Sequence, residues 1–226
     1  MTNNTSNAYE SKKINEFITI TGEFRHEYIV EKSKFITTLC PCSTEQEAQQ
    51  FISRINKEFW DAHHNCTAFA LGPCQEQQRS SDNGEPSGTA GKPMLEVLKK
   101  TGITNIAVVV TRYFGGIKLG AGGLIRAYST AVSSTVQLAP KELHTQREQL
   151  QATVDYGNFG AIKRYLANRN LSFTSDFGES VTLLILVTVD EVDTVITALQ
   201  NMTGGTVTYK TLGLDNVVLP YTIDNE

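Results

Sequence analysis

Two glycine-rich stretches contain the residues whose types and spacing could do chemistry. The first covers residues 84–92 and the second covers residues 115–123, and each leads into a pattern typical of a helix. A helix N-terminus presents unpaired N–H groups and partial positive charge, and glycines let an anion approach the backbone closely. The sequence therefore predicts an anion-binding surface. The same glycines would also suit tight turns in a compact core, so both interpretations stay open.

Basic, hydroxyl and aromatic side chains in and beside these stretches would complete such a surface. Segment 82–126 holds six Lys or Arg residues against three Asp or Glu residues, whereas the whole chain of 226 residues has a formal net charge of −4. Tyr113 and Phe114 could stack on single-stranded RNA, or they could end a buried strand. The residues predicted to bind an anion or a nucleic acid are Ser87, Gly88, Thr89, Gly91, Lys92, Arg112, Tyr113, Gly115, Gly116, Lys118, Gly122, Gly123 and Arg126.

Neither stretch matches a standard nucleotide-binding motif. Pro86 and Pro93 occupy positions where a phosphate-binding P-loop needs Gly and Ser or Thr. Ile125 stands where the dinucleotide-binding fingerprint needs its third glycine. An ordinary nucleotide triphosphate or dinucleotide site is therefore not expected, and no cofactor is predicted.

Two acidic residues complicate the anion hypothesis, because carboxylates repel an anion unless Mg²⁺ bridges them or they point into turns. Asp82 begins an Asp-Asn-Gly sequence, which favours an Asx turn. Glu85 could instead pair with Arg112 or Arg126. These pairings decide how much positive charge the surface keeps.

His63, His64 and Cys66 form a second group of polar residues, with Cys74 further along the chain. Their spacing matches no standard zinc signature, so no metal site is predicted. In a strand, His64 and Cys66 would point to one face and His63 to the other. A Ser-His-Asp triad lacks the Gly-x-Ser-x-Gly elbow, so no catalytic residue is predicted either.

The periodicity of apolar residues predicts an α+β protein with two domains. Residues 1–15 are expected to be disordered, residues 16–139 to form the first domain, residues 140–213 the second, and residues 214–226 a tail. Strands are expected at 17–20, 28–39, 66–71 and 106–110, helices at 44–60, 93–102 and 120–138, and a long polar loop at 72–91. The second domain should have the order βαββαβ of a ferredoxin-like unit, with strands at 150–154, 171–177, 181–189 and 207–212 and helices at 159–168 and 190–202.

Composition limits the possible environments of the chain. Its 40% hydrophobic content is ordinary for a globular protein, and no apolar run reaches the roughly 20 residues that span a bilayer. The N-terminal residues lack the apolar core of a signal peptide. We therefore expect a cytoplasmic protein without a membrane partner, whose four cysteines stay unpaired in a reducing compartment.

Four blocks of the sequence resemble the signature of the IMPACT/YigZ family of small cytosolic proteins. They are Glu31–Ile36, Ala62–Cys66, Asp82–Pro93 and Thr111–Tyr128, and the resemblance covers roughly residues 16–138. The family's signature polar positions correspond to His63, His64, Asp82 and Glu85. Asn83 departs from the pattern, because many members would have Asp there, and a metal that needed two adjacent acids would bind more weakly.

The resemblance implies a first domain with the ribosomal-protein-like βαβ fold of domain IV of elongation factor G, and a second that resembles the ferredoxin-like C-terminal domain of that factor. It also implies a role in the regulation of translation, since eukaryotic relatives act through a protein partner upstream of an initiation-factor kinase. Bacterial members have also been labelled proline dipeptidases.

Three functions follow as hypotheses. The first is a non-catalytic module that binds RNA or the ribosome and influences translation. The second is a metal-assisted X-Pro dipeptidase-like hydrolase centred on the four signature polar residues, although a two-metal centre would need more carboxylates and histidines. The third is a protein-interaction module whose basic face binds an acidic partner.

Overall fold

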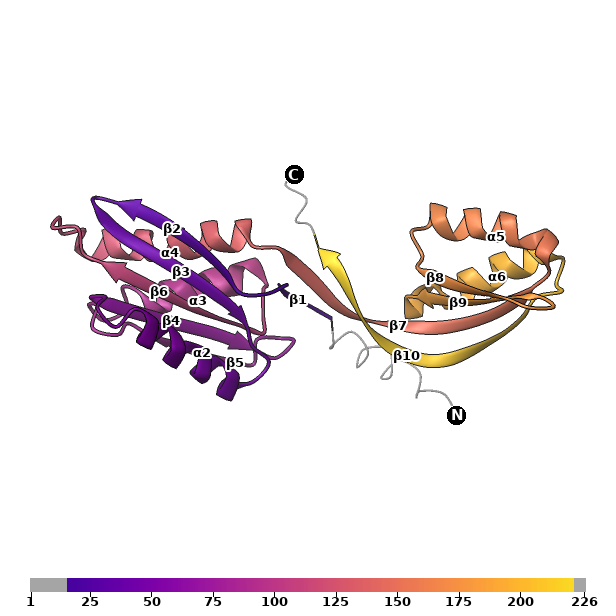
Figure 1. Cartoon of the computed structure of the whole chain (residues 1–226), viewed down its shortest axis with the longest axis horizontal. Coiled ribbons are helices and arrows are strands. Elements are labelled where there is room, and N and C mark those ends of the chain that lie inside the picture. Colours follow the sequence, from indigo (N-terminus) through magenta and orange to yellow (C-terminus); the bar gives the residue numbers. More distant parts are fainter. Residues whose placement is uncertain (1–15, 222–226) are drawn as a thin grey trace, which may run out of the picture. The chain divides into compact units, whose positions relative to one another are not determined.

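The computed structural model describes residues 16–221 and divides them into two compact units. The first unit contains residues 16–144 together with 218–221, and the second contains residues 145–217. The division falls inside one strand, β7 (Lys141–Val154), rather than at the expected boundary after residue 139. The predicted disorder of residues 1–15 lies outside the described residues. Two sheets and their helices make this an α+β protein (Figure 1).

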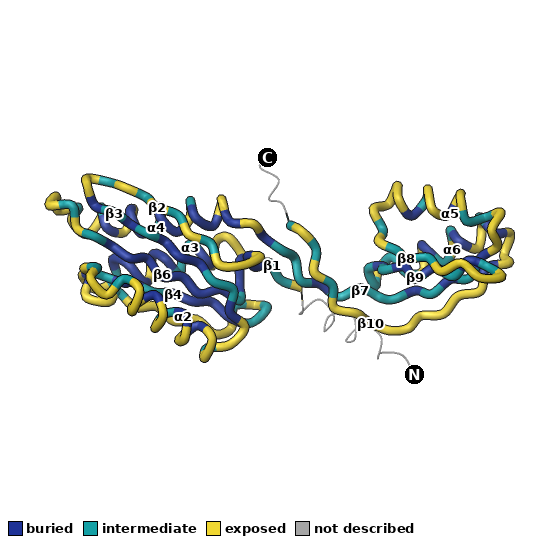
Figure 2. Tube along the Cα trace, in the orientation of Figure 1, coloured by how far each residue is buried: buried dark blue, intermediate teal, exposed yellow. Residues whose placement is uncertain are grey.

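A five-stranded sheet forms the centre of the first unit, and every pair of neighbouring strands in it is antiparallel. Its strands follow the order β2-β3-β6-β4-β5. Their bounds are β2 (Phe24–Val30), β3 (Ser33–Pro41), β4 (His64–Leu71), β5 (Gln77–Ser81) and β6 (Ile106–Tyr113). Figure 2 shows that the central strands are the buried part of this unit.

Helices cover both faces of this sheet, and the alternation of residues along β6 shows how. Val108 and Val110 pack into the core beneath α3 (Gly91–Thr101) and α4 (Gly120–Leu138). Ala107 and Val109 pack against α2 (Glu45–Glu58) on the opposite face. A strand buried on both faces reads as a continuous apolar run, which is why β6 was predictable from its sequence.

The helix ends of the first unit largely follow local sequence signals. The hydroxyl of Thr44 accepts the N–H of Glu47 at 3.2 Å, so Thr44 caps α2 at the start of the helix predicted over 44–60. The helix α3 begins at Gly91, before the predicted start, and ends at Gly102, whose φ of 67° lies in the left-handed region. The bounds of α4 agree with the prediction.

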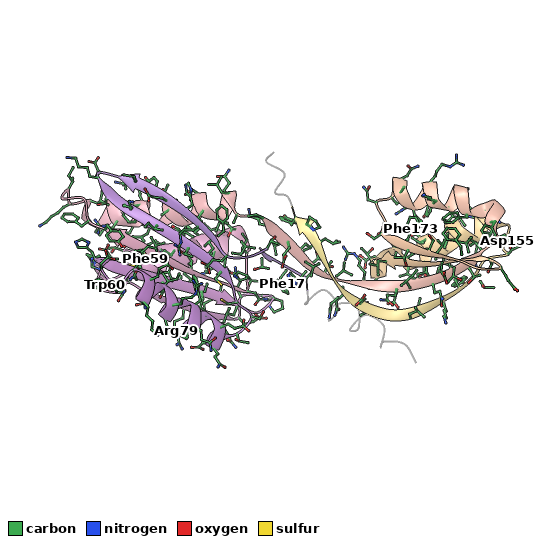
Figure 3. The ribbon with its side chains drawn as sticks, viewed as in Figure 1. Phe17, Phe59, Trp60, Arg79, Asp155 and Phe173 are labelled. Atoms are coloured by element: carbon green, nitrogen blue, oxygen red, sulfur yellow. The ribbon has the colours of Figure 1, made fainter. Side chains whose placement is uncertain are left out.

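Two predictions for the first unit are wrong. The expected single strand over 28–39 is a hairpin, because the chain reverses at Glu31 and Lys32 with φ values of 46° and 61°. The expected loop at 72–91 contains β5, an exposed strand that pairs with β4. Arg79 on β5, labelled in Figure 3, forms a 2.6 Å ion pair with Glu45 at the start of α2.

The second unit has its own core of aliphatic residues, including Leu150, Ile162, Leu183 and Val195. The strand β7 pairs with β9, β9 pairs with β8, and β10 pairs with β7. The first residues of β7 also pair with β1 (Phe17–Ile20), within the first unit. The elements after β7 are α5 (Tyr156–Asn168), β8 (Phe173–Phe177), β9 (Val181–Val187), the short 3₁₀ helix η2 (Val189–Glu191), α6 (Val192–Thr203) and β10 (Thr208–Tyr221).

Two details of the second unit differ from the prediction. The helix predicted over 190–202 begins only at Val192, because Asp190 lies inside η2, and α6 has no side-chain cap. The last strand extends to Tyr221, so the described part of the predicted tail over 214–226 is β-strand. Among the described helices, none is both long and apolar enough to cross a membrane.

Candidate functional site

A cleft of about 390 Å³ opens in the first unit beside the N-terminus of α4. Two of its walls come from the paired ends of β4 and β6, where His64 lies opposite Arg112 in the register. The loop before α3 and the first turn of α4 provide the others. The polar and aromatic residues that line the cleft are His63, His64, Glu85, Arg112, Phe114 and Lys118.

A buried ion pair forms the floor of the cleft. Glu85 and Arg112 are only 8% and 5% exposed, and Oε1 of Glu85 lies 2.6 Å from Nη1 of Arg112. The same Oε1 accepts the hydroxyl of Tyr128 at 2.8 Å. The predicted pairing of Glu85 is therefore with Arg112, and Arg126 plays no part in it. The Nε of Arg112 is buried without a hydrogen-bond partner, and the guanidinium lies over the rings of Phe35 and Phe114.

One buried thiol, of Cys66, and one buried hydroxyl, of Tyr128, extend the hydrogen-bond network of Glu85 below the floor of the cleft. The thiol of Cys66 lies 2.9 Å from the carbonyl oxygen of Asp82 and 3.3 Å from the hydroxyl of Tyr128. Burial raises the pKa of the Cys66 thiol to about 12 and raises the pKa of the Tyr128 hydroxyl well above its usual value. Both groups therefore stay protonated at neutral pH, and Tyr128 remains a donor to Glu85.

The two adjacent histidines are held in opposite tautomers by backbone groups. Nδ1 of His64 lies 3.0 Å from the carbonyl oxygen of Asn83, and a carbonyl can only accept, so this Nδ1 carries the hydrogen. Nδ1 of His63 accepts the N–H of Phe114 at 3.3 Å, so the hydrogen of His63 is on Nε2. Both rings line the cleft, although they were predicted on opposite faces, because β4 begins only at His64.

The carboxylate of Asp82 occupies the anion position of the first glycine-rich stretch. Oδ1 accepts the N–H groups of Ala90 and Gly91 at 3.0 and 2.8 Å, and Oδ2 accepts the N–H of Gly88 at 2.8 Å. Burial alone would raise the pKa of Asp82, but these three hydrogen bonds outweigh it and lower the pKa. The predicted phosphate-binding amides of this stretch thus hold a carboxylate of the chain itself, and Asp82 caps α3 instead of forming the expected Asx turn.

The remaining residues predicted in the first stretch are also engaged or face outwards. The hydroxyl of Thr89 is buried and donates to the carbonyl of Pro86 at 2.7 Å. A Cβ on Gly91 would lie 2.7 Å from the backbone nitrogen of Ser81, so this glycine allows close packing. Ser87 is exposed and forms no hydrogen bond with the described residues. Within this stretch, the hydroxyl of Ser87 and the side chain of Lys92 therefore stay open to a ligand.

The second glycine-rich stretch divides into a packing part and an open part. A Cβ on Gly115 would lie 2.0 Å from the backbone carbon of Lys32, so the absence of a side chain allows the close approach to the β2–β3 turn. Gly116 has a φ of 85°, in the left-handed region that favours glycine. The first turn of α4, which includes Gly122 and Gly123, has no acidic residue and no side-chain cap. Its N–H groups are therefore the predicted amides that stay open to an anion.

The predicted cations do not meet in one pocket, contrary to the expectation that they converge. Arg112 is paired with Glu85, so its charge is neutralised, and Lys118 lines the cleft. Lys92 lines a separate groove of about 460 Å³ between α3 and α4, together with Lys100. Lys100 was missed, although its spacing of two helical turns from Lys92 places both on one side of α3.

The two aromatic residues predicted to stack on RNA or to end a strand differ in their exposure: Tyr113 ends β6 and Phe114 is exposed. Tyr113 donates its hydroxyl to Oδ1 of Asp61 at 2.9 Å, and burial together with this bond raises the pKa of Tyr113. Phe114 is 41% exposed at the cleft, so it is the available stacking surface. Across residues 16–221 no group of three or more His, Cys, Asp or Glu side chains could hold a metal ion, and all four cysteines are free thiols.

Comparison with known proteins places both parts of the chain. The model of the Impact N-terminal domain matches residues 31–136, and that of a domain of unknown function, DUF1949, matches residues 153–206. One crystal structure of a hypothetical protein has a TM-score of 0.56 with 29% sequence identity, and the likeness covers 86% of this chain and 96% of that one.

Relatives of known name cover much of the chain. The IMPACT family member YvyE of Bacillus subtilis is 47% identical over 68% of this chain and 70% of its own length. An IMPACT family member of Haemophilus influenzae is 36% identical over 70% and 77% of the two lengths, and YigZ of Escherichia coli is 42% identical over 53% and 57%. These matches extend well beyond the signature blocks, and the chain belongs to the IMPACT family.

Proposed function

We propose that this protein is a non-catalytic RNA- or ribosome-binding protein that takes part in the regulation of translation, and that its α3–α4 face contacts RNA phosphates. We define this face by the four exposed cations of α3, α4 and the preceding loop, which are Lys92, Lys100, Lys118 and Arg126. Within residues 16–221, none of these four side chains has a carboxylate within 4.0 Å. This is the observation that carries the proposal.

Unpaired cations are the groups that bind a phosphate backbone most readily, because they release condensed counterions without breaking an existing ion pair. Other cations of the first unit, such as Arg25, Arg54 and Arg79, are paired with Glu residues. On α3, Glu96 is already neutralised by Lys99 at 3.0 Å, and α4 contains no acidic residue. The face therefore keeps a positive charge on a chain whose net charge is −4.

Fold analogy supports the same conclusion. We infer that the first unit shares the fold of domain IV of elongation factor G and a small-subunit ribosomal protein, and that the second is ferredoxin-like, since its element order is βαββαβ. Binding to RNA or the ribosome also implies a cytoplasmic location, which fractionation of cells would check.

The proposal is tested by titrating fluorescent single-stranded and structured RNA with the wild-type protein and a variant. The variant carries Lys92→Gln, Lys100→Gln, Lys118→Gln and Arg126→Gln. A matched control carries Lys57→Gln, Lys163→Gln, Arg164→Gln and Lys210→Gln, which removes the same charge from exposed positions elsewhere. We expect the first variant to lose affinity on the order of a hundredfold and the control to lose much less. Equal losses, or no binding by the wild-type protein at low salt, would refute the proposal.

One further experiment and the arrangement of the side chains separate two other roles from RNA binding. A pull-down from nuclease-treated lysate distinguishes an acidic protein partner from one bridged by RNA. A metal-assisted hydrolase is not supported by the arrangement of the described side chains, because Asp82 is held by three amides and Glu85 by Arg112 and Tyr128.

A further inference from the structure

The cleft beside α4 has unsatisfied hydrogen-bond acceptors on its floor. Oε1 of Glu85 is engaged by Arg112 and Tyr128, but Oε2 has no hydrogen-bond partner among the described residues. The Glu85 side chain is only 3% exposed, so this oxygen faces the cleft rather than bulk water. A carboxylate oxygen that opens into a cleft without a protein donor is free to accept a hydrogen bond from a ligand or a water molecule.

A second acceptor lies beside it. Because Nδ1 of His64 donates to the carbonyl of Asn83, Nε2 of the neutral ring carries a lone pair. This Nε2 lies 4.0 Å from Oε2 of Glu85. Two acceptors that face each other at this distance are suited to a ligand with two adjacent donors.

The charge of the floor favours neutral donors over a cation. Arg112 lies 2.6 Å from Glu85 and already neutralises its carboxylate. An ammonium group placed at Oε2 would also face the guanidinium of Arg112 and be repelled by it. A pair of neighbouring hydroxyl groups satisfies both acceptors without adding charge.

Features suited to an anion and to a planar ring line other walls of the same cleft. Lys118 and the first residues of α4, Gly120 and Ala121, supply a cation and backbone amides that no side chain caps. Phe114 is 41% exposed and offers a ring face. The volume of about 390 Å³ lies within the range typical of small-ligand sites.

We propose that this cleft binds a ribose with a free cis-diol and a 5′-phosphate, as found at the 3′-terminal nucleotide of RNA. The 2′ and 3′ hydroxyls donate to Oε2 of Glu85 and Nε2 of His64, the phosphate lies against Lys118 and the first turn of α4, and the base stacks on Phe114. Internal nucleotides lack the free 3′ hydroxyl, so only the nucleotide at the 3′ end of the strand offers both donors to the cleft. The proposal rests on the proposed RNA binding and names the nucleotide that the cleft would take.

The test compares 5′-labelled RNA oligonucleotides of one sequence that end in a free cis-diol, a 2′,3′-dideoxy residue or a 2′,3′-cyclic phosphate, of which the last two lack both hydroxyl donors. We expect the wild-type protein to bind the cis-diol end roughly tenfold more tightly than either other end, since two hydrogen bonds to the acceptors are lost. His64→Phe should remove this preference with little effect on the other two ends. Glu85→Gln should do the same and serves as a second variant.

A surface variant separates this proposal from the general binding of RNA. Lys92→Gln combined with Lys100→Gln should weaken all three RNAs by the same factor, because these residues lie in the separate groove. Equal binding of all three ends by the wild-type protein would overturn the terminal-nucleotide proposal while leaving the RNA-binding function standing.

Competition by free nucleotides identifies the source of the ribose. If 5′-AMP competes for the cleft but the 3′ end of RNA has no effect, a free nucleotide is the ligand and the RNA terminus is refuted. If no RNA binds at all, the proposed function fails, and direct titration with 5′-AMP and its 2′,3′-dideoxy analogue decides the cleft alone. Absence of any preference for the diol in that titration would end the proposal.

Discussion

Asp82 decides how much of the first glycine-rich stretch can meet an external anion. Its carboxylate accepts three backbone N–H groups from the loop and from the start of α3. It therefore occupies the position where the sequence pattern predicted an external anion. An acidic residue near a phosphate-like glycine loop can therefore indicate that the loop binds its own chain. The same contact fixes the position of Glu85, three residues later, at the floor of the cleft.

Removing the charge of Asp82 should destabilise the first unit. For Asp82→Asn we expect a loss of about 2 kcal/mol in the free energy of unfolding at pH 7, because hydrogen bonds to a charged acceptor are among the stronger ones. The folded pKa is lowered, so the stabilisation is present above the unfolded value of about 3.9 and is lost as the pH falls through the folded value. The difference between the two proteins should therefore shrink in acid.

Urea denaturation across the acid range measures this effect. The exposed residue Asp176 on β8 provides a control, and Asp176→Asn should change the free energy of unfolding little at any pH. A constant difference between wild type and Asp82→Asn down to the lowest pH at which both fold would contradict the assignment.

The four thiols should differ in reactivity with iodoacetamide at pH 8. A hydrogen bond from Cys42 lowers the pKa of Cys40, and Cys74 is exposed, so both should react in the folded protein. Cys66 has its pKa raised to about 12 by burial, so only about one molecule in ten thousand carries the thiolate at that pH. Mass spectrometry of quenched samples should find Cys66 unmodified until urea is added. Alkylation of Cys66 as fast as Cys74 would contradict a closed network around Tyr128.

At the scale of elements, the turn between β2 and β3 supports the loop that leads to α4. Gly115 passes so close to this turn that its N–H donates to the hydroxyl of Ser33 at 3.2 Å. The same hydroxyl lies 3.4 Å from Nη2 of Arg112. The turn, the loop and the floor of the cleft are thus tied together at one buried serine.

A side chain at Gly115 should disturb this arrangement. In Gly115→Ala the added Cβ would lie 2.0 Å from the backbone of Lys32, and relieving the overlap should cost about 1–3 kcal/mol of unfolding free energy. At Gly22 an added Cβ would meet nothing within 4 Å, so Gly22→Ala should change stability by less than about 1 kcal/mol. Thermal and urea denaturation of both variants checks the contrast, and similar stabilities would contradict the close approach.

Local signals made some elements predictable and left others hidden. The cap of α2 at Thr44, the apolar strand β6 and the start of α4 at Gly120 follow from neighbouring residues. The β2–β3 turn uses Glu31 and Lys32 in the left-handed region, where sequence rules expect Gly or Asn. The edge strand β5 has no buried residue, so no alternation of apolar residues marks it.

The candidate site was less predictable because its contacts join distant segments. The partner of Glu85 could be narrowed to two arginines, but the register of β4 and β6 selects Arg112 and places His64 beside it. The tautomers of the two histidines depend on backbone groups of Asn83 and Phe114, which no spacing rule gives. The residue types indicated which groups could bind a ligand, whereas their pairing and tautomers could be assigned only from the fold.

At the scale of the whole molecule, charge is distributed unequally along the chain. Segment 82–126 has a positive balance, whereas segment 141–226 holds six Lys or Arg residues against eleven Asp or Glu residues. The proposed RNA contacts therefore belong to the first unit, and the acidic second segment offers no comparable attraction for phosphate. The RNA affinity at a single salt concentration would not show which unit supplies the phosphate contacts. The dependence of that affinity on salt concentration, measured on charge variants of each region, does.

The most direct test of the account is the slope of the logarithm of RNA affinity against the logarithm of salt concentration. Each phosphate neutralised on a single strand contributes about 0.7 to this slope, so removing the four cations of the α3–α4 face should reduce its magnitude by roughly 3. The control variant with Lys57, Lys163, Arg164 and Lys210 replaced by Gln should keep nearly the wild-type slope. If both quadruple variants have the same slope, the α3–α4 face is not where this protein meets RNA.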